Sequence, residues 1–500
     1  MLPVEQNATA APKIGGSAAI RVMREPTSLL SLVDTDPITA GIVNHFVLET
    51  LVRMSDDGTT ARPELAERFE IDEASHTYTF YLAENARWHD GTPVTSTDVR
   101  FVFGKLSDPF NPFPQTHIFS NIADIDTPNA DTVIFKLDKR VPGFTAALAE
   151  VPILPMHVFG RTPLPLHEAS RAPVGSGPYR FVRWVPSQMI EIERNPDWRG
   201  KQPYLDEIRF LFVPDNRIAV DMFTHGDLDI ILDYPTGAST PTEDARIVSF
   251  PLPYIETWLF NRNRPIFREA SVRRATSMLI DKRVIRCAAL ECQADLTDES
   301  PLSDRPDALL FPTVSFDPNA ARRLLDSAGW RIGAPAVRVK GTRELRFSLL
   351  VPNLGRDAER AAVIIQEDLA GAGIDMKISM VSRGAFMGRI STGRFDAAAV
   401  PMPLGAMDGS LSFLHSESGF STGGEADRKM DALIDALRAE LGNKQQAELR
   451  RQIATHTAQS TPLAYLYRPY GAALVRSSLA GVHITDGHLK LTELFQKEAP

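Results

Sequence analysis

A serine between two glycines, Gly175-Ser176-Gly177, is the segment of this sequence that comes nearest to a catalytic nucleophile. Its spacing differs from GxSxG, the turn that presents the nucleophile of α/β-hydrolases. The sequence also lacks the GxxxxGK(S/T) loop that cradles phosphates and the HExxH helix that binds zinc. Since a serine flanked by glycines is more often part of a tight turn, we interpret Ser176 as structural and expect no catalytic residue.

Histidines are too scattered in the sequence to predict a metal centre. The eleven histidines include no pair four residues apart, so no helix turn presents two imidazoles on one face. We interpret His89, beside Asp90, as a turn neighbour and His157 as a structural histidine. We therefore expect no bound metal and no other cofactor.

Cys287 and Cys292 are the only cysteines of the chain. Two cysteines are too few for a disulfide scaffold, and their spacing is not the CxxC of metal and redox sites. A local disulfide in an oxidising compartment and two unpaired structural thiols both fit the sequence. Of the two, unpaired thiols are the preferred interpretation.

The composition is that of a globular protein with more than one domain. The 500 residues are 43% hydrophobic and 23% charged, which is enough to build two or three cores. The net charge of -9, from 54 basic and 63 acidic residues, argues against a nucleic-acid partner. No run of about eighteen uncharged apolar residues occurs, so we expect no segment that crosses a bilayer.

Local patterns predict where several helices and strands begin. Alternating apolar residues at 77–82 predict a half-buried strand. Thr95 and Asp98 form a capping-box variant at the start of a helix, and Asp317 followed by Pro318 is suited to begin another.

In the second half of the chain, the sequence predicts alternating helices and strands. Residues 359–400 read as helix, strand, helix and strand, and residues 425–441 and 445–458 as two more helices. No repeat of 20–50 residues is present, which disfavours solenoids and propellers. We therefore predict an α/β protein with some antiparallel structure.

Several short motifs occur in a fixed order along the chain. They are Ala86-Arg87-Trp88-His89-Asp90-Gly91-Thr92-Pro93-Val94-Thr95 with Asp98-Val99, Val174-Gly175-Ser176-Gly177-Pro178-Tyr179, Asn195-Pro196-Asp197-Trp198, Gly226-Asp227-Leu228-Asp229, Asn261, Pro265-Ile266-Phe267, Val272-Arg273-Arg274-Ala275, Ile280-Asp281, Asp317-Pro318 through Ala328-Gly329-Trp330, and Pro462-Leu463-Ala464-Tyr465-Leu466-Tyr467. This series resembles the peptide/nickel-type extracytoplasmic solute-binding proteins (family 5) of ABC transporters, whose hallmark is WHDGxPvTAxDV. The resemblance covers residues from about 14 to 485.

The resemblance implies a periplasmic-binding-protein-like fold with mixed sheets and two lobes joined by two hinge-crossing strands. We place these crossings near 254–262 and 463–471. Lobe one then holds 17–255 and 471–500, with an inserted subdomain at 45–170. Lobe two holds 256–470, and residues 1–16 form a flexible N-terminal tether. The implied mechanism is hinge closure on a small ligand that is then passed to a membrane permease.

The same resemblance suggests residues for the ligand site. Relatives hold a peptide amine with an aspartate in a segment like 404–416, where Asp408 is the candidate; Asp408 could equally cap a turn. Candidate pocket walls are the aromatic residues Trp258, Tyr254, Phe386, Tyr465 and Tyr467, each of which also suits core packing. Arg468, or Arg383, could hold a carboxylate.

Other functions within and outside this fold stay open at the level of sequence. The ligand could be peptide-like, an oligosaccharide, an opine-like compound or a metal chelate, and the protein could serve a chemoreceptor instead of a permease. A hydrolase is the remaining alternative. We expect a monomer in the periplasm or another extracytoplasmic space. The start of the chain lacks the pattern of a secretory signal. Removal of the signal is the preferred interpretation; a differently assigned natural start and a protein that stays inside the cell are the alternatives.

Overall fold

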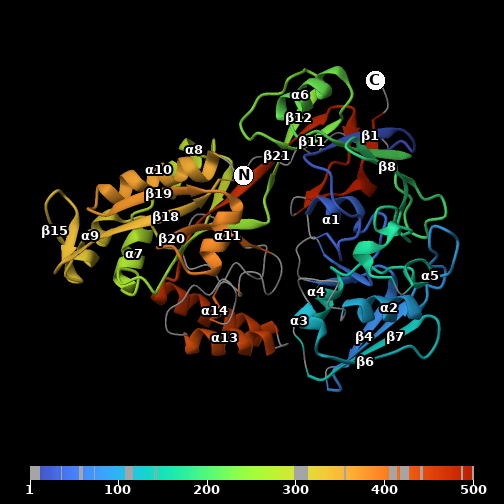
Figure 1. The fold of residues 1–500 in the computed structure, drawn as a ribbon, viewed down its shortest axis with the longest axis horizontal. Helices are drawn as coiled ribbons and strands as arrows, with labels where there is room; N and C mark the ends of the chain where they lie inside the picture. Colours follow the sequence, from blue (N-terminus) through green and yellow to red (C-terminus); the bar gives the residue numbers. More distant parts are fainter. Residues whose placement is uncertain are drawn as a thin grey trace. The chain divides into compact units, whose positions relative to one another are not determined.

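The computed structural model shows a mixed α/β protein whose chain divides into two compact units (Figure 1). The structure describes residues 12–34, 37–55, 60–72, 74–106, 116–139, 141, 143–160, 162–297, 314–353, 356–404, 411, 414–416, 427–439, 443–485 and 488–497. Among them, unit 1 comprises the residues before Pro251 and those from Gly471 onward, and unit 2 comprises Pro251–Tyr470. The domain boundaries expected from the sequence, including the inserted subdomain, stay a prediction.

The main sheet of unit 1 is built around three parallel strands. β1 (Ser17–Val22) lies between β10 (Glu207–Phe212) and β11 (Ile230–Tyr234), and the chain crosses from β10 to β11 through α6 (Asn216–His225). Asp215 caps α6 by accepting hydrogen bonds from the amides of its first turn. β9 (Met189–Arg194) and β8 (Tyr179–Val185) extend the sheet with antiparallel pairing.

A second sheet of unit 1 is antiparallel, with the order β4-β5-β7-β6. Its core is an aromatic cluster in which the rings of Phe80, Phe103 and Phe144 pack on Phe135. The strands of this sheet and the remaining elements of unit 1 are α1 (Pro37–Val43), β2 (Val52–Met54), β3 (Ala61–Pro63), β4 (Ala66–Asp72), β5 (Thr77–Leu82), α2 (Ser96–Leu106), α3 (Thr116–Phe119), β6 (Ile122–Asp126), β7 (Thr132–Leu137), α4 (Phe144–Leu148), α5 (Met156–Phe159), η1 (Leu164–Leu166), η2 (Glu168–Ser170), β12 (Ala245–Pro251), β22 (Leu479–Ala480), β23 (Ile484–Thr485), β24 (His488–Leu489), η4 (Leu491–Glu493) and β25 (Phe495–Gln496).

The sheet of unit 2 has hydrophobic clusters on both faces. Its order is β19-β18-β20-β13-β21, with β14 also paired to β21. Trp258 belongs to one cluster and Thr257 points to the opposite face, because neighbouring residues of a strand alternate. The elements are β13 (Tyr254–Phe260), α7 (Ala270–Met278), α8 (Lys282–Ala288), β14 (Ala294–Leu296), α9 (Pro318–Ser327), β15 (Arg331–Ile332), β16 (Arg338–Lys340), β17 (Arg343–Glu344), β18 (Arg346–Pro352), α10 (Arg356–Ala370), β19 (Asp375–Val381), α11 (Arg383–Ser391), β20 (Ala397–Pro403), α13 (Arg428–Ala439), α14 (Asn443–Ser460) and β21 (Leu463–Arg476).

Over the residues that the structure describes, the chain passes between the units twice. It leaves unit 1 after Phe250 and returns after Tyr470, so β21 contributes residues to both. Its first half pairs with β13 in unit 2, and its last residues, Ala472–Val475, pair with β11 in unit 1. Two chain segments therefore join the units covalently.

The helices and strands expected from local patterns are confirmed. β5 occupies 77–82, and Asp98 accepts hydrogen bonds from the amide and the hydroxyl of Thr95 at the start of α2. Asp317 caps α9 by accepting from the amide of Ala320. The elements α10, β19, α11 and β20 follow the predicted order over 356–403, and α13 and α14 are the two later helices.

The preferred interpretation of the cysteines is wrong. Cys287 and Cys292 form a disulfide bond, and no described cysteine is free. The chain reverses after α8 with positive φ angles at Glu291 (52°) and Cys292 (62°), and the turn brings the two cysteine Cα atoms to 4.0 Å. A separation of five residues is enough for a disulfide bond because of this turn, and the cysteine spacing alone does not reveal the turn.

Arg273, in the VRRA motif, joins α7 to the end of α14. Its buried guanidinium donates to the carbonyl oxygens of Ser460 and Thr461, and also to those of Phe267 and Arg268. All of these acceptors are backbone oxygens, and burial lowers the pKa of Arg273 to about 10. The motif therefore serves the packing of unit 2.

We expect Arg273→Ala to lower the free energy of unfolding by about 2–3 kcal/mol, because it leaves carbonyl oxygens buried without donors. Urea denaturation followed by the protection of α14 amides from hydrogen exchange measures the effect. Arg274→Ala is the control, since the Arg274 side chain is exposed. An equal loss in both variants would contradict the bridging role of Arg273.

Candidate ligand-binding site

The glycine-rich motif and the WHDG motif bind each other in unit 1. The His89 amide donates to the carbonyl oxygen of Gly175 at 2.7 Å, and His89 Nδ1 accepts from the Gly175 amide at 3.2 Å. The other ring nitrogen, Nε2, lies 3.0 Å from the Gly177 carbonyl oxygen, which assigns it the proton. Burial lowers the pKa of His89 to about 4, so the ring stays neutral and its two partners stay fixed.

Two further motifs also make structural contacts. Asn195 donates from its side chain to the Gly177 carbonyl oxygen at 3.1 Å. Asp229 accepts from the amide of Ala19 on β1 at 2.8 Å. His157 pairs with Asp90 at 2.7 Å. His89 and His157 thus both make contacts that suit a structural role, and these motif residues hold unit 1 together.

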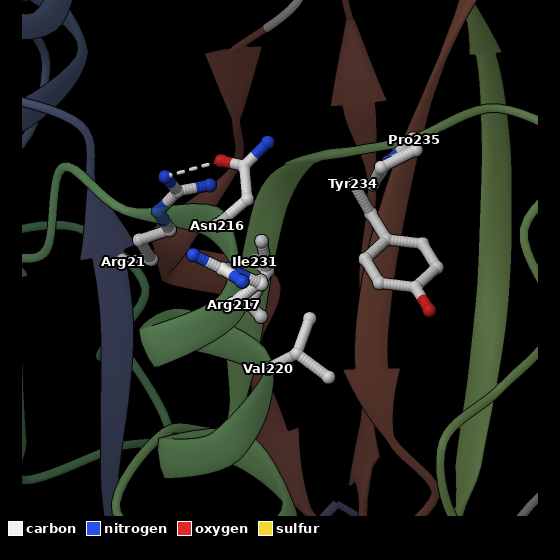
Figure 2. Close-up of a pocket in the computed structure, with 7 residues that line it drawn as sticks. All are labelled: Arg21, Asn216, Arg217, Val220, Ile231, Tyr234 and Pro235. Atoms are coloured by element: carbon white, nitrogen blue, oxygen red, sulfur yellow. Dashed lines mark hydrogen bonds between the residues drawn. The ribbon is translucent and has the colours of Figure 1, made fainter.

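Unit 1 has a pocket of about 320 Å3 beside α6 and the carboxyl end of β11. Figure 2 shows its lining, with Arg21 joined to Asn216 on one side and Tyr234 on the other. The lining residues are Arg21, Asn216, Arg217, Val220, Ile231, Tyr234 and Pro235. Ligands of open α/β sheets commonly bind at the carboxyl ends of strands, so the position suits a binding surface.

Arg21 cannot bind an anion in this pocket. Its five N–H donors are directed to Asp233, Asn216 and the carbonyl oxygens of Val213 and Pro214, all within 3.1 Å. Arg217 is exposed, and it is the arginine of the lining that could contact a ligand carboxylate. The pocket therefore offers mainly an apolar wall with one exposed cation, Arg217.

Unit 2 gathers acidic and phenolic groups on one face of the β13–β21 pair. Glu256 and Tyr467 are cross-strand partners, and Tyr254 precedes Glu256 by two residues on the same face. Asp357, in the first turn of α10, acts electrostatically on both tyrosines. Tyr254 and Tyr467, two of the predicted pocket aromatics, are thus brought together around a carboxylate.

Burial sets the electrostatics of this group. It raises the pKa of Glu256 to about 7. Burial also raises the pKa values of Tyr254 and Tyr467 above their usual range, and the negative charges of Glu256 and Asp357 add to this effect. Burial likewise raises the pKa of Asp357, which the nearby Arg360 opposes. The cluster is a region of negative potential that a cation would stabilise.

The other predicted site residues lie in different surroundings. Trp258 is buried in the same hydrophobic cluster as Tyr467, whereas Phe386 and Tyr465 are buried together in the cluster on the opposite face. Arg468 donates to the carbonyl oxygen of Leu252 at 2.8 Å. Asp408 lies outside the described residues. Ligand contact by any of these side chains stays a prediction.

Sequence reasoning missed Glu256. A charged residue between Tyr254 and Trp258 in an apolar strand is unusual, and its alternation with these aromatics was a signal available in the sequence. Among the residues described, no three histidine, cysteine or acidic side chains come together as a metal site. Over the same residues, no helix is long and apolar enough to cross a membrane.

The sequence matches the family described as bacterial extracellular solute-binding proteins, family 5 (middle region), over residues 60–420. This match covers more than half of the chain. The chain belongs to this family. Its two-unit α/β architecture agrees with that assignment.

Relatives of known identity support the same placement. The oligopeptide-binding protein AppA of Bacillus subtilis is 25% identical over 489 residues, covering 94% of this chain and 89% of AppA. The solved structure of CtaP, an ABC transporter substrate-binding protein of Listeria monocytogenes, matches with a TM-score of 0.85 at 20% identity, covering 97% of this chain and 100% of CtaP.

A second solved structure comes from a nickel-chelate complex. NikZ of Campylobacter jejuni, in complex with Ni(L-His), matches with a TM-score of 0.80 at 20% identity, covering 96% of this chain and 99% of NikZ. At this level of identity the likeness concerns the fold. The relatives are binding proteins, and the fold of this chain is the two-lobed fold of family 5.

Proposed function

We propose that this protein captures a peptide or a similar small polar solute outside the cytoplasm and delivers it to the permease of an ABC importer. The observation that carries the proposal is the similarity to AppA, an oligopeptide-binding protein, along nearly the whole chain. The family match over residues 60–420 supports it independently. The ligand leaves chemically unchanged, so the protein is not an enzyme in this proposal.

The two units would act as lobes that close on the ligand. Two covalent connections, after Phe250 and after Tyr470, are the segments about which such a movement would occur. Contacts that form only when both lobes touch the ligand shift the population toward the closed form, which a permease can recognise. A single chain with both lobes needs no second copy for this cycle, so we propose a monomer without a cofactor.

Within this proposal, Asp408 receives the α-ammonium group of the peptide. A carboxylate that is shielded from water forms a strong charge-assisted hydrogen bond with an ammonium group. Tyr254, Trp258 and Tyr467, on one face of the sheet, supply apolar contact for varied side chains, and Arg468 a partner for the terminal carboxylate. Phe386 and Tyr465, on the opposite face, take no part in this site. This assignment rests on the family resemblance of the segment 404–416.

We expect peptides from a library of two to nine residues to raise the melting temperature of the protein without being consumed. A ligand at one hundred times its Kd stabilises the folded state by about 2.7 kcal/mol. Thermal-shift assays measure the stabilisation, and mass spectrometry of the recovered peptides checks that they are intact. Asp408→Ala should abolish the shift for peptides with a free amine.

Two controls make this experiment decisive. N-acetylated peptides should lose affinity for the unchanged protein and show no further loss with Asp408→Ala. Ni(L-His) serves as a comparison probe. Stabilisation by the chelate but by no peptide would contradict the peptide assignment, and cleaved peptides would indicate a hydrolase.

A further inference from the structure

The two segments that connect the units are hydrogen-bonded to each other directly beside the crossing. β12 ends at Pro251 and pairs with β21. At the next residue, the Leu252 amide donates to the carbonyl oxygen of Pro469 at 2.9 Å. Leu252 and Pro469 both belong to unit 2 and lie next to its boundaries, after Phe250 and after Tyr470. This contact therefore joins the outgoing segment to the returning one.

Pro469 leaves this contact incomplete. In an antiparallel pair of this kind, the two residues exchange two hydrogen bonds, since each amide donates to the carbonyl oxygen of the other residue. Proline has no amide hydrogen, so Pro469 accepts from Leu252 and cannot donate in return. The main chain of Pro469 therefore supplies no donor to the carbonyl oxygen of Leu252.

The Arg468 side chain supplies the donor that Pro469 lacks. Its Nε donates to the carbonyl oxygen of Leu252 at 2.8 Å. Arg468 directly precedes Pro469 on β21, and its main chain is the partner of Asp295 on β14. Both backbone groups of Leu252 are therefore bonded to the returning segment, the amide to a main-chain oxygen and the carbonyl oxygen to a side chain.

Further contacts fix the returning segment in unit 2 just before it enters unit 1. The Tyr470 amide donates to the carbonyl oxygen of Gln293 at 3.0 Å, and the Tyr470 hydroxyl donates to Asp295 at 3.0 Å. From Ala472 onward, β21 pairs with β11 of unit 1. The bond from Arg468 to Leu252 thus lies in a group of contacts that ends where the chain changes units.

We propose that Arg468 is a positioning residue of the hinge: it replaces the hydrogen bond that Pro469 cannot make and keeps the two connecting segments paired, so that they turn together when the lobes close. This inference rests on the proposed function and adds a residue that guides the closure. If the segments separate, each can move on its own, and the open form samples more arrangements. Ordering a broader open ensemble costs more entropy when a ligand binds.

Arg468→Met tests the pairing in the absence of ligand, because it removes the donor and keeps the apolar stem of the side chain. We expect the Leu252 amide to exchange roughly ten- to hundredfold faster in this variant, the range of a hydrogen bond to a charged group. Pro251 and Pro253 have no amide hydrogen, so Leu252 is the one exchanging amide between Phe250 and Tyr254. Hydrogen exchange of this segment can therefore be assigned to it.

Pro469→Ala provides a rescue that a merely structural role of Arg468 would not predict. The substitution restores a main-chain amide that can donate to the carbonyl oxygen of Leu252. The double variant Arg468→Met with Pro469→Ala should therefore regain most of the protection of the Leu252 amide. Arg264→Met is the matched control, since it removes an Nε donor to the carbonyl oxygen of Phe395 at 2.9 Å in the same unit. It should leave the exchange of Leu252 unchanged.

Distances between spin labels connect the hinge to lobe closure. Arg100→Cys on α2 and Glu367→Cys on α10 place one nitroxide on an exposed helix position of each unit, and the native cysteines are already bonded to each other. We expect the distance distribution without ligand to be broader with Arg468→Met and to become narrow again when Pro469→Ala is added.

Trialanine and its C-terminal amide separate the hinge role from carboxylate binding. A role in the hinge predicts that both peptides lose affinity with Arg468→Met and that Pro469→Ala restores the binding of the amide. A loss confined to the free acid, without rescue, assigns Arg468 to the ligand carboxylate alone and overturns the inference. Unchanged exchange of Leu252, or exchange that Pro469→Ala does not rescue, also overturns it and leaves peptide capture standing.

The measurements without ligand keep this inference distinguishable from the proposed function. If neither trialanine nor any peptide of the library binds the unchanged protein, peptide capture is contradicted. Faster exchange of Leu252 with Arg468→Met, a broader distance distribution and their rescue by Pro469→Ala would then still support the hinge role.

Discussion

Gly175→Ala is expected to disrupt the folding of unit 1, with a loss of more than about 4 kcal/mol in the free energy of unfolding. A Cβ atom at this position would lie 1.7 Å from the carbonyl oxygen of Val47 and 2.6 Å from its carbonyl carbon. Both are backbone atoms, so no side-chain rotation relieves the overlap. Either the segment around Val47 or the segment around Gly175 must therefore move.

Movement at Gly175 breaks the contacts between the motifs. The Val47 carbonyl oxygen accepts from the amide of Gly177 at 3.1 Å, and both glycines bind the ring of His89. Hydrogen exchange resolved by segment should show lost protection at 45–50 and 86–90, while unit 2 keeps its protection. Local measurement is needed because a chain with two units does not guarantee two-state unfolding.

Gly104→Ala is the matched control for this substitution. Gly104 lies on the exposed side of α2, where an added Cβ meets no atom within 4 Å. Alanine is favoured over glycine in a helix by roughly 0.5–1 kcal/mol, so the control should stabilise unit 1. Equal behaviour of the two variants would show that the close approach at Gly175 is not a constraint on the fold.

The local elements of this protein could be predicted because their causes are local. Asp317 and Pro318 specify the start of α9, and Gly329, with a φ of 87°, follows its end. Alternation at 77–82 specified β5 for the same reason. Each of these inferences needs only residues that lie within a few positions of one another.

Contacts between distant segments were not predictable from the sequence. The role of His89 depends on Gly175 and Gly177, which lie about ninety residues away in the chain, and only the folded structure places its two ring nitrogens on their backbone. The Glu256 cluster likewise depends on the register of β13 and β21, because a shift by one residue would turn Tyr467 to the other face.

For the candidate site, the sequence predicted the types of residue better than it predicted where those residues lie in the fold. The aromatic residues Tyr254 and Tyr467 were chosen for their chemistry and lie together, while Phe386 and Tyr465, chosen by the same criterion, pack in a different cluster. An aromatic side chain packs equally well in a hydrophobic core and in a pocket wall, so the residue type alone does not show in which of the two it lies. An unpaired carboxylate is more informative, because a core excludes it.

A buried ion pair in unit 1 illustrates the opposite case, in which the carboxylate has its partner. Glu49 is fully buried, and both of its oxygens accept from Arg199, one of them at 2.7 Å from Nη1. Arg199 also donates to the carbonyl oxygen of Glu64 at 2.9 Å. Even so, burial raises the pKa of Glu49 to about 7.

Arg199→Met should therefore destabilise unit 1 in a manner that depends on pH. Without the guanidinium, the pKa of Glu49 rises further, and the native state holds a proton that the unfolded state releases above its ordinary value of 4.5. Stability then falls as the pH rises from about 4.5 to the raised pKa. The unchanged protein shares this fall up to about pH 7, so the variant departs from it mainly above that pH. We expect a small loss at pH 5 and an additional loss of about 2 kcal/mol at pH 8.5, at about 1.4 kcal/mol per pH unit.

The double variant Glu49→Gln with Arg199→Met tests this explanation. Glutamine removes the charge that Arg199 compensates, so the double variant should recover much of the stability at pH 8.5 and lose the extra pH dependence. Urea denaturation at both pH values provides the double-mutant cycle. If Arg199→Met costs as much at pH 5 as at pH 8.5, the loss comes from packing, including the stacking of Arg199 on Trp198, and the ion pair does not account for the stability of this segment.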